Sequence, residues 1–346
     1  MAAGCRGIRL RRVAAVLRFR FAFATIVRNP ESLVLWDSGI TRKNRSLASV
    51  REMSETLTKS RRKTLVTTVV DRLLTTESDW NPKVAVGRIA VRVVPAKWLF
   101  AFKKRYYYPR LLRRHLLPEP DAVIIAHLLS PGDHVIDIGA SIGQYTKFLS
   151  GCVGPNGFVY SFEPLPPTFE ILSSCVRKLN LTKVELFNCA ISDVDGSTVM
   201  LIPLYRWGTE CHYDARIAGE NDKDQEGLRR FTVAKRAIDS VFREREERIS
   251  FIKCDVNYHE LSFVRGSVET TRRFKPAMLV EVGTNPDASV AEKVLAILRE
   301  QGYEAYKFDG AKLRRRTLGR RDQNWFFLQP NHLALLHERC PQLLAI

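Results

Sequence analysis

The chain has 346 residues, 45% of them hydrophobic, and a formal net charge of +18 at pH 7. This length and composition fit one large globular domain plus an extension. The charge is uneven, because residues 1–115 hold 26 of the 55 Lys and Arg residues but only 7 of the 37 Asp and Glu residues. The basic character therefore belongs to the front of the chain. This argues against an enzyme that modifies nucleic acid, since such enzymes carry positive charge around the active site.

The cysteine pattern indicates reduced thiols. The chain has 7 cysteines, an odd number, and no C-x-x-C pair. We expect buried thiols rather than a disulfide framework or a zinc site, and hence a reducing, cytoplasmic location. The most apolar long stretches, 13–27 and 84–102, are interrupted by Arg or Lys, so no transmembrane helix is predicted.

Residues 1–95 are expected to form a basic, partly disordered extension. The first 30 residues contain seven arginines and no acid. This composition fits a transit peptide, a basic helix on an anionic membrane, or a start without fixed structure. Residues 97–115 interleave aromatic and cationic side chains, which favours an amphipathic helix over a base-stacking surface. We assign 96–130 to a helical lead-in.

From residue 131 onward, strands and helices alternate, which is typical of a parallel sheet with crossover helices. The expected strands are 134–138, 158–162, 184–190, 249–256, 277–282, 303–308 and 324–328. The expected helices are 119–129, 143–151, 167–179, 260–273, 288–301 and a short one at 333–336. Asp195-Gly196 is a hairpin signal, so Thr198–Pro203 is predicted as an added antiparallel strand, followed by a loop over 204–230. The predicted catalytic domain is 131–330, with a tail at 331–346.

The most informative stretch is an apolar strand that ends in Asp137 and is followed by Gly139 and Gly143. Gly139 permits a sharp turn, and Asp137 lies at the strand end where open α/β sheets bind ligands. The dinucleotide fingerprint would require glycines where this chain has Ser141 and Gln144. The observed spacing instead resembles motif I of class I S-adenosylmethionine (SAM) methyltransferases. A purely structural turn is the alternative.

Acids end the next three strands. Glu163 is placed to accept the ribose hydroxyls of a nucleoside, with helix capping as the alternative. Asp193 is placed near an adenine amino group, or it forms an Asx turn. Asp255 would orient or deprotonate a hydroxyl, hold a cation, or form a structural ion pair. His259 and Glu260 begin the helix that follows. No His/Asp/Glu cluster has metal-ligand spacing, so no metal is predicted.

Several ordered stretches together resemble the FkbM family of SAM-dependent methyltransferases. They are Asp137-Ile138-Gly139-Ala140-Ser141-Ile142-Gly143, Phe162-Glu163-Pro164-Leu165-Pro166, Ala190-Ile191-Ser192-Asp193 with Gly196, Ala237-Ile238-Asp239, Phe251-Ile252-Lys253-Cys254-Asp255-Val256 with Glu260 and Gly266, and Asn324-Trp325-Phe326-Phe327. The resemblance implies a Rossmann-like, mostly parallel seven-stranded sheet flanked by helices, with SAM as cofactor. It also implies O-methylation of a hydroxyl on a sugar or small natural product.

The resemblance assigns roles to single residues. The predicted SAM-binding residues are Asp137, Gly139, Ala140, Ser141, Gly143, Glu163 and Asp193. The predicted catalytic residues are Asp255, His259 and Glu260. The expected partner is a small-molecule or glycan acceptor rather than a nucleic acid, and the sequence does not indicate an oligomeric state.

One departure from the family affects the acceptor side. The family usually reads Asp-Val-Glu-Gly-x-Glu where this chain reads Asp255-Val256-Asn257-Tyr258-His259-Glu260. A carboxylate is replaced by an amide and a glycine by Tyr258. Two alternatives therefore stay open: a non-catalytic scaffold with the same fold, and an RNA methyltransferase that uses the basic front segment.

Overall fold

The computed structural model of the protein describes residues 96–114, 119–203, 215–219, 227–282, 287–316 and 324–345. The chain divides into two compact units, Met1–Lys103 and Lys104–Ile346. In the first unit the structure describes helix α5 (Ala96–Phe102). The predictions for residues 1–95 lie outside the described residues. None of the described helices combines the length and apolar character that a membrane crossing requires.

The second unit is built on an eight-stranded sheet with the order β11-β10-β12-β9-β8-β1-β2-β3. Its strands are β1 (His134–Ile138), β2 (Phe158–Phe162), β3 (Val184–Phe187), β8 (Ile249–Cys254), β9 (Ala277–Val280), β10 (Glu304–Phe308), β11 (Leu313–Arg315) and β12 (Trp325–Leu328). Five neighbouring strands, from β9 to β3, pair in parallel, whereas β12 is antiparallel to both β9 and β10. The seven predicted strands are present, and β11 adds an antiparallel edge.

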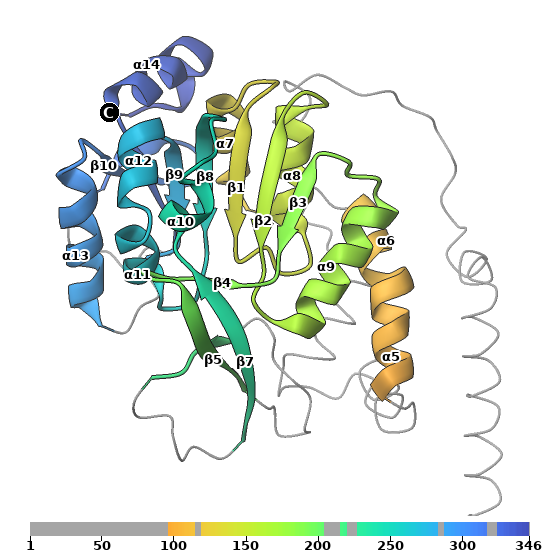
Figure 1. Cartoon of the computed structure of the whole chain (residues 1–346). Helices are drawn as coiled ribbons and strands as arrows, with labels where there is room; N and C mark the ends of the chain where they lie inside the picture. Colours follow the sequence, from red (N-terminus) through yellow and green to blue (C-terminus); the bar gives the residue numbers. More distant parts are fainter. Residues whose placement is uncertain are drawn as a thin grey trace, which may run out of the picture. The chain divides into compact units, whose positions relative to one another are not determined.

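Helices cover both faces of this sheet (Figure 1). They are α7 (Ala122–Leu128), α8 (Gln144–Val153), α9 (Pro166–Lys178), α10 (Ile238–Phe242), α11 (Glu260–Arg265), α12 (Val268–Phe274), α13 (Ala288–Arg299) and α14 (Pro330–Arg339). The π-helical turn η2 (Lys103–Tyr107) and α6 (Tyr108–Arg114) precede them, and the 3-10 turn η5 (Pro341–Leu343) follows. The buried side chains of α7, α8 and α14 join one hydrophobic cluster, and those of α10 to α13 join another.

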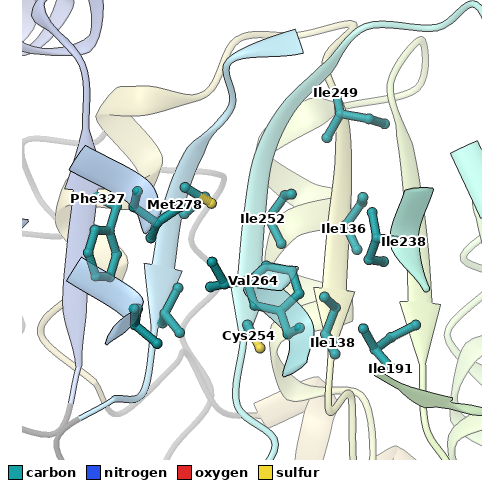
Figure 2. Packing of buried hydrophobic residues seen from close by; sticks show 14 of the residues in the cluster. Ile136, Ile138, Ile191, Ile238, Ile249, Ile252, Cys254, Val264, Met278 and Phe327 are labelled. Carbon is teal, nitrogen blue, oxygen red and sulfur yellow. The ribbon is translucent and has the colours of Figure 1, made fainter. Parts of the chain in front are cut away.

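The alternation of side chains along the strands builds these two clusters. Figure 2 shows one of them, where Ile136 of β1, Ile252 of β8, Met278 of β9 and Phe327 of β12 lie among buried apolar neighbours. Residues one position further along each strand point to the opposite face, since the side-chain period of a strand is two. Both faces are apolar, as expected for a parallel sheet buried between helices.

A second, four-stranded sheet has the order β4-β7-β5-β6. Its strands are β4 (Ala190–Ile191), β5 (Gly196–Pro203), β6 (Arg216–Ile217) and β7 (Leu228–Arg236). The predicted antiparallel strand at 198–203 is present within β5, but its partners are β7 and β6, so it forms no hairpin with the strand that precedes it. The loop predicted over 204–230 extends too far, because residues from Leu228 onward belong to β7. Figure 1 shows β5 and β7 extending together from the main sheet.

The predicted helix over 260–273 is two helices that separate at Gly266. A Cβ on Gly266 would lie 2.1 Å from the backbone oxygen of Ser192, so only glycine allows this close approach. The contact brings the end of α11 beside the segment that leaves β4. The helix predicted at 333–336 is longer than expected and spans Pro330–Arg339, beginning with a capping box formed by Gln329 and His332.

Candidate functional site

The turn after β1 is held by backbone hydrogen bonds to the neighbouring strand. The N–H groups of Gly139 and Ala140 both donate to the carbonyl of Phe162, at 3.0 and 2.9 Å. Gly139 has a φ of 76°, and a Cβ there would lie 1.9 Å from the backbone oxygen of Asp255. Gly143, with a φ of 97°, begins helix α8. Gly139 therefore makes the sharp turn that the sequence predicted, and it also permits the close approach of the Asp255 backbone, which the sequence did not predict.

Glu163 lies at the end of β2, and its carboxylate points back to this turn. Its side chain is buried, with Oε2 accepting from the N–H of Ser141 and Oε1 from the N–H of Leu165, each at 3.0 Å. Burial raises the pKa of Glu163 to about 7, although the two N–H groups favour the ionised form. The carboxylate thus joins the ends of two neighbouring parallel strands.

A first pocket lies over the ends of β1, β2 and β8. Its lining includes residues of the glycine turn, of the segment after β2, and of the second sheet: Gly139, Ser141, Glu163, Leu165, Cys189, Ile191, Met200, Ala215, Ile217, Asp255, Asn257 and His259. Met200 and Ala215 belong to the apolar cluster beneath the second sheet. That sheet therefore supplies one apolar wall of the pocket.

Asp137 is fully buried and does not line the first pocket. Its Oδ2 accepts a hydrogen bond from Thr146 Oγ1 at 2.6 Å, and the Thr146 oxygen lies 3.1 Å from Ser161 Oγ. Its Oδ1 has no hydrogen-bond partner among the described residues. Burial raises the pKa of Asp137, while the nearby ammonium of Lys253 opposes the shift.

Lys253 is a buried cation that the sequence interpretation assigned no role. Its Nζ lies 3.3 Å from Asp255 Oδ2 and 3.4 Å from the carbonyl oxygen of Gly139, and it lies 4.9 Å from the ring centroid of Tyr145. Lys253 is 5% exposed. It neutralises Asp255 and connects β8 to the glycine turn.

Asp255 and Glu281 form a carboxyl pair at the ends of β8 and β9. Burial opposes ionisation of Asp255, but Lys253 and a hydrogen bond from Glu281 hold its pKa below the usual value. Burial, together with the charge of Asp255, raises the pKa of Glu281 to about 8. At neutral pH the pair therefore holds one proton, with Glu281 donating it to the Asp255 carboxylate.

His259, Ser192 and Asp193 form a chain of hydrogen bonds beside the first pocket. Ser192 Oγ donates to Asp193 Oδ1 at 3.0 Å and lies 3.0 Å from His259 Nε2. A hydroxyl has one hydrogen to donate, so His259 Nε2 must be the donor to Ser192. Burial lowers the pKa of His259, although the charge of Asp193 opposes the shift. Neutral His259 thus keeps a lone pair on Nδ1.

Asp193 does not line the first pocket. The chain leaves the main sheet after β3, and β4 belongs to the second sheet, so Asp193 follows a strand that the main sheet does not contain. Its carboxylate faces Ser192 and Lys235, whose Nζ is 3.9 Å away. Ala190 and Ile191 line the pocket in its place. The adenine role of Asp193 stays a prediction.

The segment that departs from the family pattern has a constrained backbone. Asn257 and Tyr258 have φ values of 45° and 74°, which favour glycine. Asn257 Nδ2 donates to the carbonyl oxygen of Ala215 at 3.0 Å, a bond that a carboxylate in its place does not form. Glu260 is fully buried, and its Oε1 accepts from the N–H of Tyr258 at 2.9 Å. Glu260 therefore lies behind the loop and does not line the first pocket.

In the described ranges, no group of three or more His, Cys, Asp or Glu residues is arranged to hold a metal ion. The five cysteines in those ranges, Cys152, Cys175, Cys189, Cys254 and Cys340, are unpaired. Burial raises the pKa of the Cys189 thiol, which lines the first pocket, to about 11. This thiol is therefore protonated at neutral pH.

The strand order and the pocket define a class of protein. The neighbouring strands of the main sheet have the spatial order β3-β2-β1-β8-β9-β12-β10, and β12 runs opposite to the others. This order, with a pocket over the ends of β1 and β2, is that of the class I methyltransferase fold. Residues 137–305 match the family model of the methyltransferase FkbM domain, so the chain contains an FkbM methyltransferase domain. Among curated proteins, none matches the chain.

Several solved structures are similar to this chain at low identity. Methyltransferase FkbM from Methylobacillus flagellatus KT is 17% identical, with 84% of this chain and 80% of that chain covered and a TM-score of 0.39. A SAM-dependent methyltransferase from Aquifex aeolicus is 18% identical, with 63% and 96% covered and a TM-score of 0.34. Aeropyrum pernix fibrillarin with natively bound S-adenosyl-L-methionine is 16% identical, with 66% and 74% covered and a TM-score of 0.33.

Proposed function

We propose that this domain transfers a methyl group from SAM to a hydroxyl oxygen of a small acceptor. The observation that carries the proposal is the Glu163 carboxylate, which lines the first pocket beside Gly139 and Ser141. Each Glu163 oxygen accepts one backbone N–H. A carboxylate oxygen has more than one lone pair, so both oxygens retain capacity for the two ribose hydroxyls of SAM.

The remaining residues of the first pocket fit the same ligand. The backbone from Gly139 through Ala140 to Ser141 is suited to hold the methionine end, and Gly143 sets the direction of the following helix. Leu165, Ile191 and Met200 supply apolar surface of the kind that an adenine ring contacts. Asp137 is buried, and we assign it to positioning: it holds Thr146 by a hydrogen bond and acts electrostatically on Lys253.

When bound, SAM supplies a methyl group on a positively charged sulfur, which is already activated for transfer. The chain must place the acceptor oxygen and remove its proton, and positioning alone accounts for much of such acceleration. We assign proton acceptance to Asp255, which lines the first pocket. At neutral pH Asp255 is the ionised member of its pair with Glu281, so it is the carboxylate that can accept the proton.

The other two predicted catalytic residues enter the proposal differently. His259 lines the first pocket and keeps the Nδ1 lone pair, so it is a second proton acceptor. Glu260 is a positioning residue, because it is buried and fixes the backbone at Tyr258.

Calorimetry of the full chain with S-adenosylhomocysteine tests the cofactor assignment, with micromolar binding expected. Transfer of a labelled methyl group from SAM to acceptors in a cell extract tests the reaction, and NMR of the product shows whether the methyl is bonded to oxygen. Absence of S-adenosylhomocysteine binding would overturn the cofactor assignment. A methyl group found on nitrogen, carbon or sulfur would overturn the O-methyl assignment.

A non-catalytic protein of the same fold is the second candidate. It is favoured by the left-handed backbone at Tyr258, where the family usually has glycine. The change lies on the acceptor side, so a scaffold would keep cofactor binding and lose transfer. Binding of S-adenosylhomocysteine without transfer to any acceptor distinguishes it from the enzyme.

A further inference from the structure

A second pocket lies beside the first, at the same edge of the main sheet. Its volume is about 620 Å³, and Asp255 lines both pockets. It lies over the ends of β8, β9 and β10. The antiparallel strand β12 begins at this edge, so Asn324 reaches it as well. The lining residues are Glu119, Pro120, Asp121, Tyr145, Lys253, Cys254, Asp255, Leu279, Glu281, Lys307 and Asn324.

Carboxyl groups outnumber cations in this pocket. Among the lining residues are four acids, Glu119, Asp121, Asp255 and Glu281, and two lysines. Both ammonium groups already have acceptors within the protein. Lys253 contacts Asp255 and the Gly139 carbonyl, and Lys307 Nζ donates to the backbone oxygen of Asn324 at 3.4 Å. Because Glu281 holds its proton at neutral pH, three carboxylates remain against two ammonium groups, and the pocket presents one excess negative charge to a ligand.

Asp121 provides an independent indication of a ligand. Its side chain is buried, with the residue 3% exposed, and Oδ2 accepts from Asn324 Nδ2 at 2.9 Å. Oδ1 is also buried but has no hydrogen-bond partner among the described residues. An unpartnered buried carboxylate oxygen is unfavourable, and a donor on a ligand would remove the penalty. Glu119, by contrast, already accepts a hydrogen bond from the Tyr145 hydroxyl.

We infer that this pocket holds the methyl acceptor, and that the acceptor carries a protonated amine in addition to the hydroxyl that is methylated. The inference rests on the proposed function, because Asp255 at the junction of the pockets would face both methyl donor and acceptor. The amine would donate to Asp121 Oδ1 and offset the excess of carboxylates. A neutral polyol would supply hydrogen bonds but no charge. A polyanion such as RNA would be repelled.

The test measures binding of matched amines and alcohols to the full chain loaded with S-adenosylhomocysteine. Glucosamine is compared with glucose, and 2-aminocyclohexanol with cyclohexane-1,2-diol, by calorimetry. The amine of each pair is expected to bind at least tenfold more tightly than its neutral partner. Equal or tighter binding of the neutral partners, or no binding of either amine, would overturn the inference.

Two variants with opposite expected effects test whether the preference for amines arises in this pocket. Asp121→Asn keeps the shape but removes the charge, and it should weaken amine binding about tenfold. Lys307→Met removes a cation and should strengthen it. Glu292→Gln, an exposed acid on α13, is the matched control and should leave amine binding unchanged. If neither Asp121→Asn nor Lys307→Met changes amine binding, the amines bind elsewhere and the inference fails.

Failure of this inference is distinguishable from failure of the proposed function. S-adenosylhomocysteine binding to the unmodified chain reports on the first pocket alone. If it binds and the amines do not, only the acceptor class is wrong. If it does not bind, the proposed function itself fails. Unchanged S-adenosylhomocysteine affinity in Asp121→Asn verifies that this variant is folded.

Discussion

The carboxylate of Glu163 accepts a hydrogen bond from the backbone N–H of Ser141 at 3.0 Å, across the ends of two neighbouring strands. Ser141 has a φ of 49°, an uncommon conformation for a non-glycine residue, which the bond to Glu163 helps to hold. The same carboxylate accepts from Leu165. The acid that we assign to the ribose thus also shapes the turn that would hold the rest of the ligand.

Replacing Glu163 by Gln should weaken binding of S-adenosylhomocysteine roughly 10- to 100-fold. The amide has one accepting oxygen in place of two, and hydrogen bonds to a charged group are worth about 1.5–3 kcal/mol. Calorimetry at pH 8, where Glu163 is ionised, measures the difference. Glu292→Gln on the exposed face of α13 is the control. Equal affinity of Glu163→Gln and the unmodified chain would remove the ribose assignment.

The same carboxylate should make cofactor binding depend on pH. Burial raises the pKa of Glu163 to about 7 in the free protein, so the group is protonated below that pH. Ribose hydroxyls stabilise the ionised form, and binding therefore lowers the pKa. The affinity for S-adenosylhomocysteine should rise as the pH increases toward 7 and level off above it.

Calorimetry in two buffers with different ionisation enthalpies should show proton release on binding at pH 6 and little at pH 8.5. Other groups near the pocket also titrate, so Glu163→Gln is the reference. In that variant the part of the pH dependence that belongs to Glu163 should be absent. Identical pH profiles in the two proteins would contradict the assignment.

Neutral His259 should carry its proton on Nε2. Ser192 uses its hydrogen for Asp193 and must accept one from His259. Burial lowers the pKa of His259, so the ring should be neutral at pH 7. Nitrogen-15 NMR should find Nδ1 without a proton and a pKa below 6.5. In Ser192→Ala this preference for one tautomer should weaken. A proton on Nδ1 in the unmodified chain would exclude Nδ1 as a proton acceptor.

The main sheet and the convergence of Glu163 with the glycine turn could be predicted because their signals are local. Apolar strands each end in a polar residue, and parallel strands bring their ends to one edge. The second sheet could not be predicted in the same way. β5 and β7 are separated by a long polar segment, and nothing in either strand specifies its partner. The apolar and β-branched run Phe231-Thr232-Val233 was the available signal.

The second pocket could not be predicted from the sequence, for a different reason. Glu119, Asp121, Lys253, Glu281 and Lys307 come from widely separated segments, and each alone looks like a solvated charge. They converge because β8, β9 and β10 run in the same direction and end at one edge of the sheet, although β12 separates β10 from β9. Only once the strand order is known do these charges become one site.

Tyr258 should be under local backbone strain that a glycine would relieve. Its φ is 74°, and this left-handed region costs a residue with a Cβ about 1–2 kcal/mol. A glycine at this position removes the strain, but it recovers only part of that free energy, because its larger loss of conformational entropy on folding costs about 0.5–1 kcal/mol. Tyr258→Gly should therefore be more stable than Tyr258→Ala by about 0.5–1 kcal/mol. Urea unfolding of the two variants measures this difference directly.

The comparison of two truncations removes the contribution of the tyrosine ring, which both variants lack. Val194 is an exposed residue outside the left-handed region and supplies the control pair. There, Val194→Ala should be more stable than Val194→Gly. If alanine is also the more stable replacement at position 258, the loop is not strained.

Three glycines should respond to alanine in a graded series. At Gly139 the new Cβ would lie 1.9 Å from the backbone oxygen of Asp255, which cannot move without shifting β8. We expect a loss of about 4 kcal/mol or more in the free energy of unfolding. At Gly143 the Cβ would lie 2.9 Å from the end of the Leu172 side chain. That side chain can rotate, so the loss should be about 1–3 kcal/mol, including the strain of positive φ.

Gly151 has the opposite expected sign. It lies within α8, where a Cβ would meet no atom within 4 Å. Alanine there should stabilise the protein by about 0.5–1 kcal/mol, since it reduces the entropy of the unfolded chain and favours the helix. Urea unfolding of all three variants gives the order. If Gly139→Ala were as stable as Gly151→Ala, the backbone of Asp255 would not lie as close to the glycine turn as the structure shows. The two pockets would then not meet at Asp255.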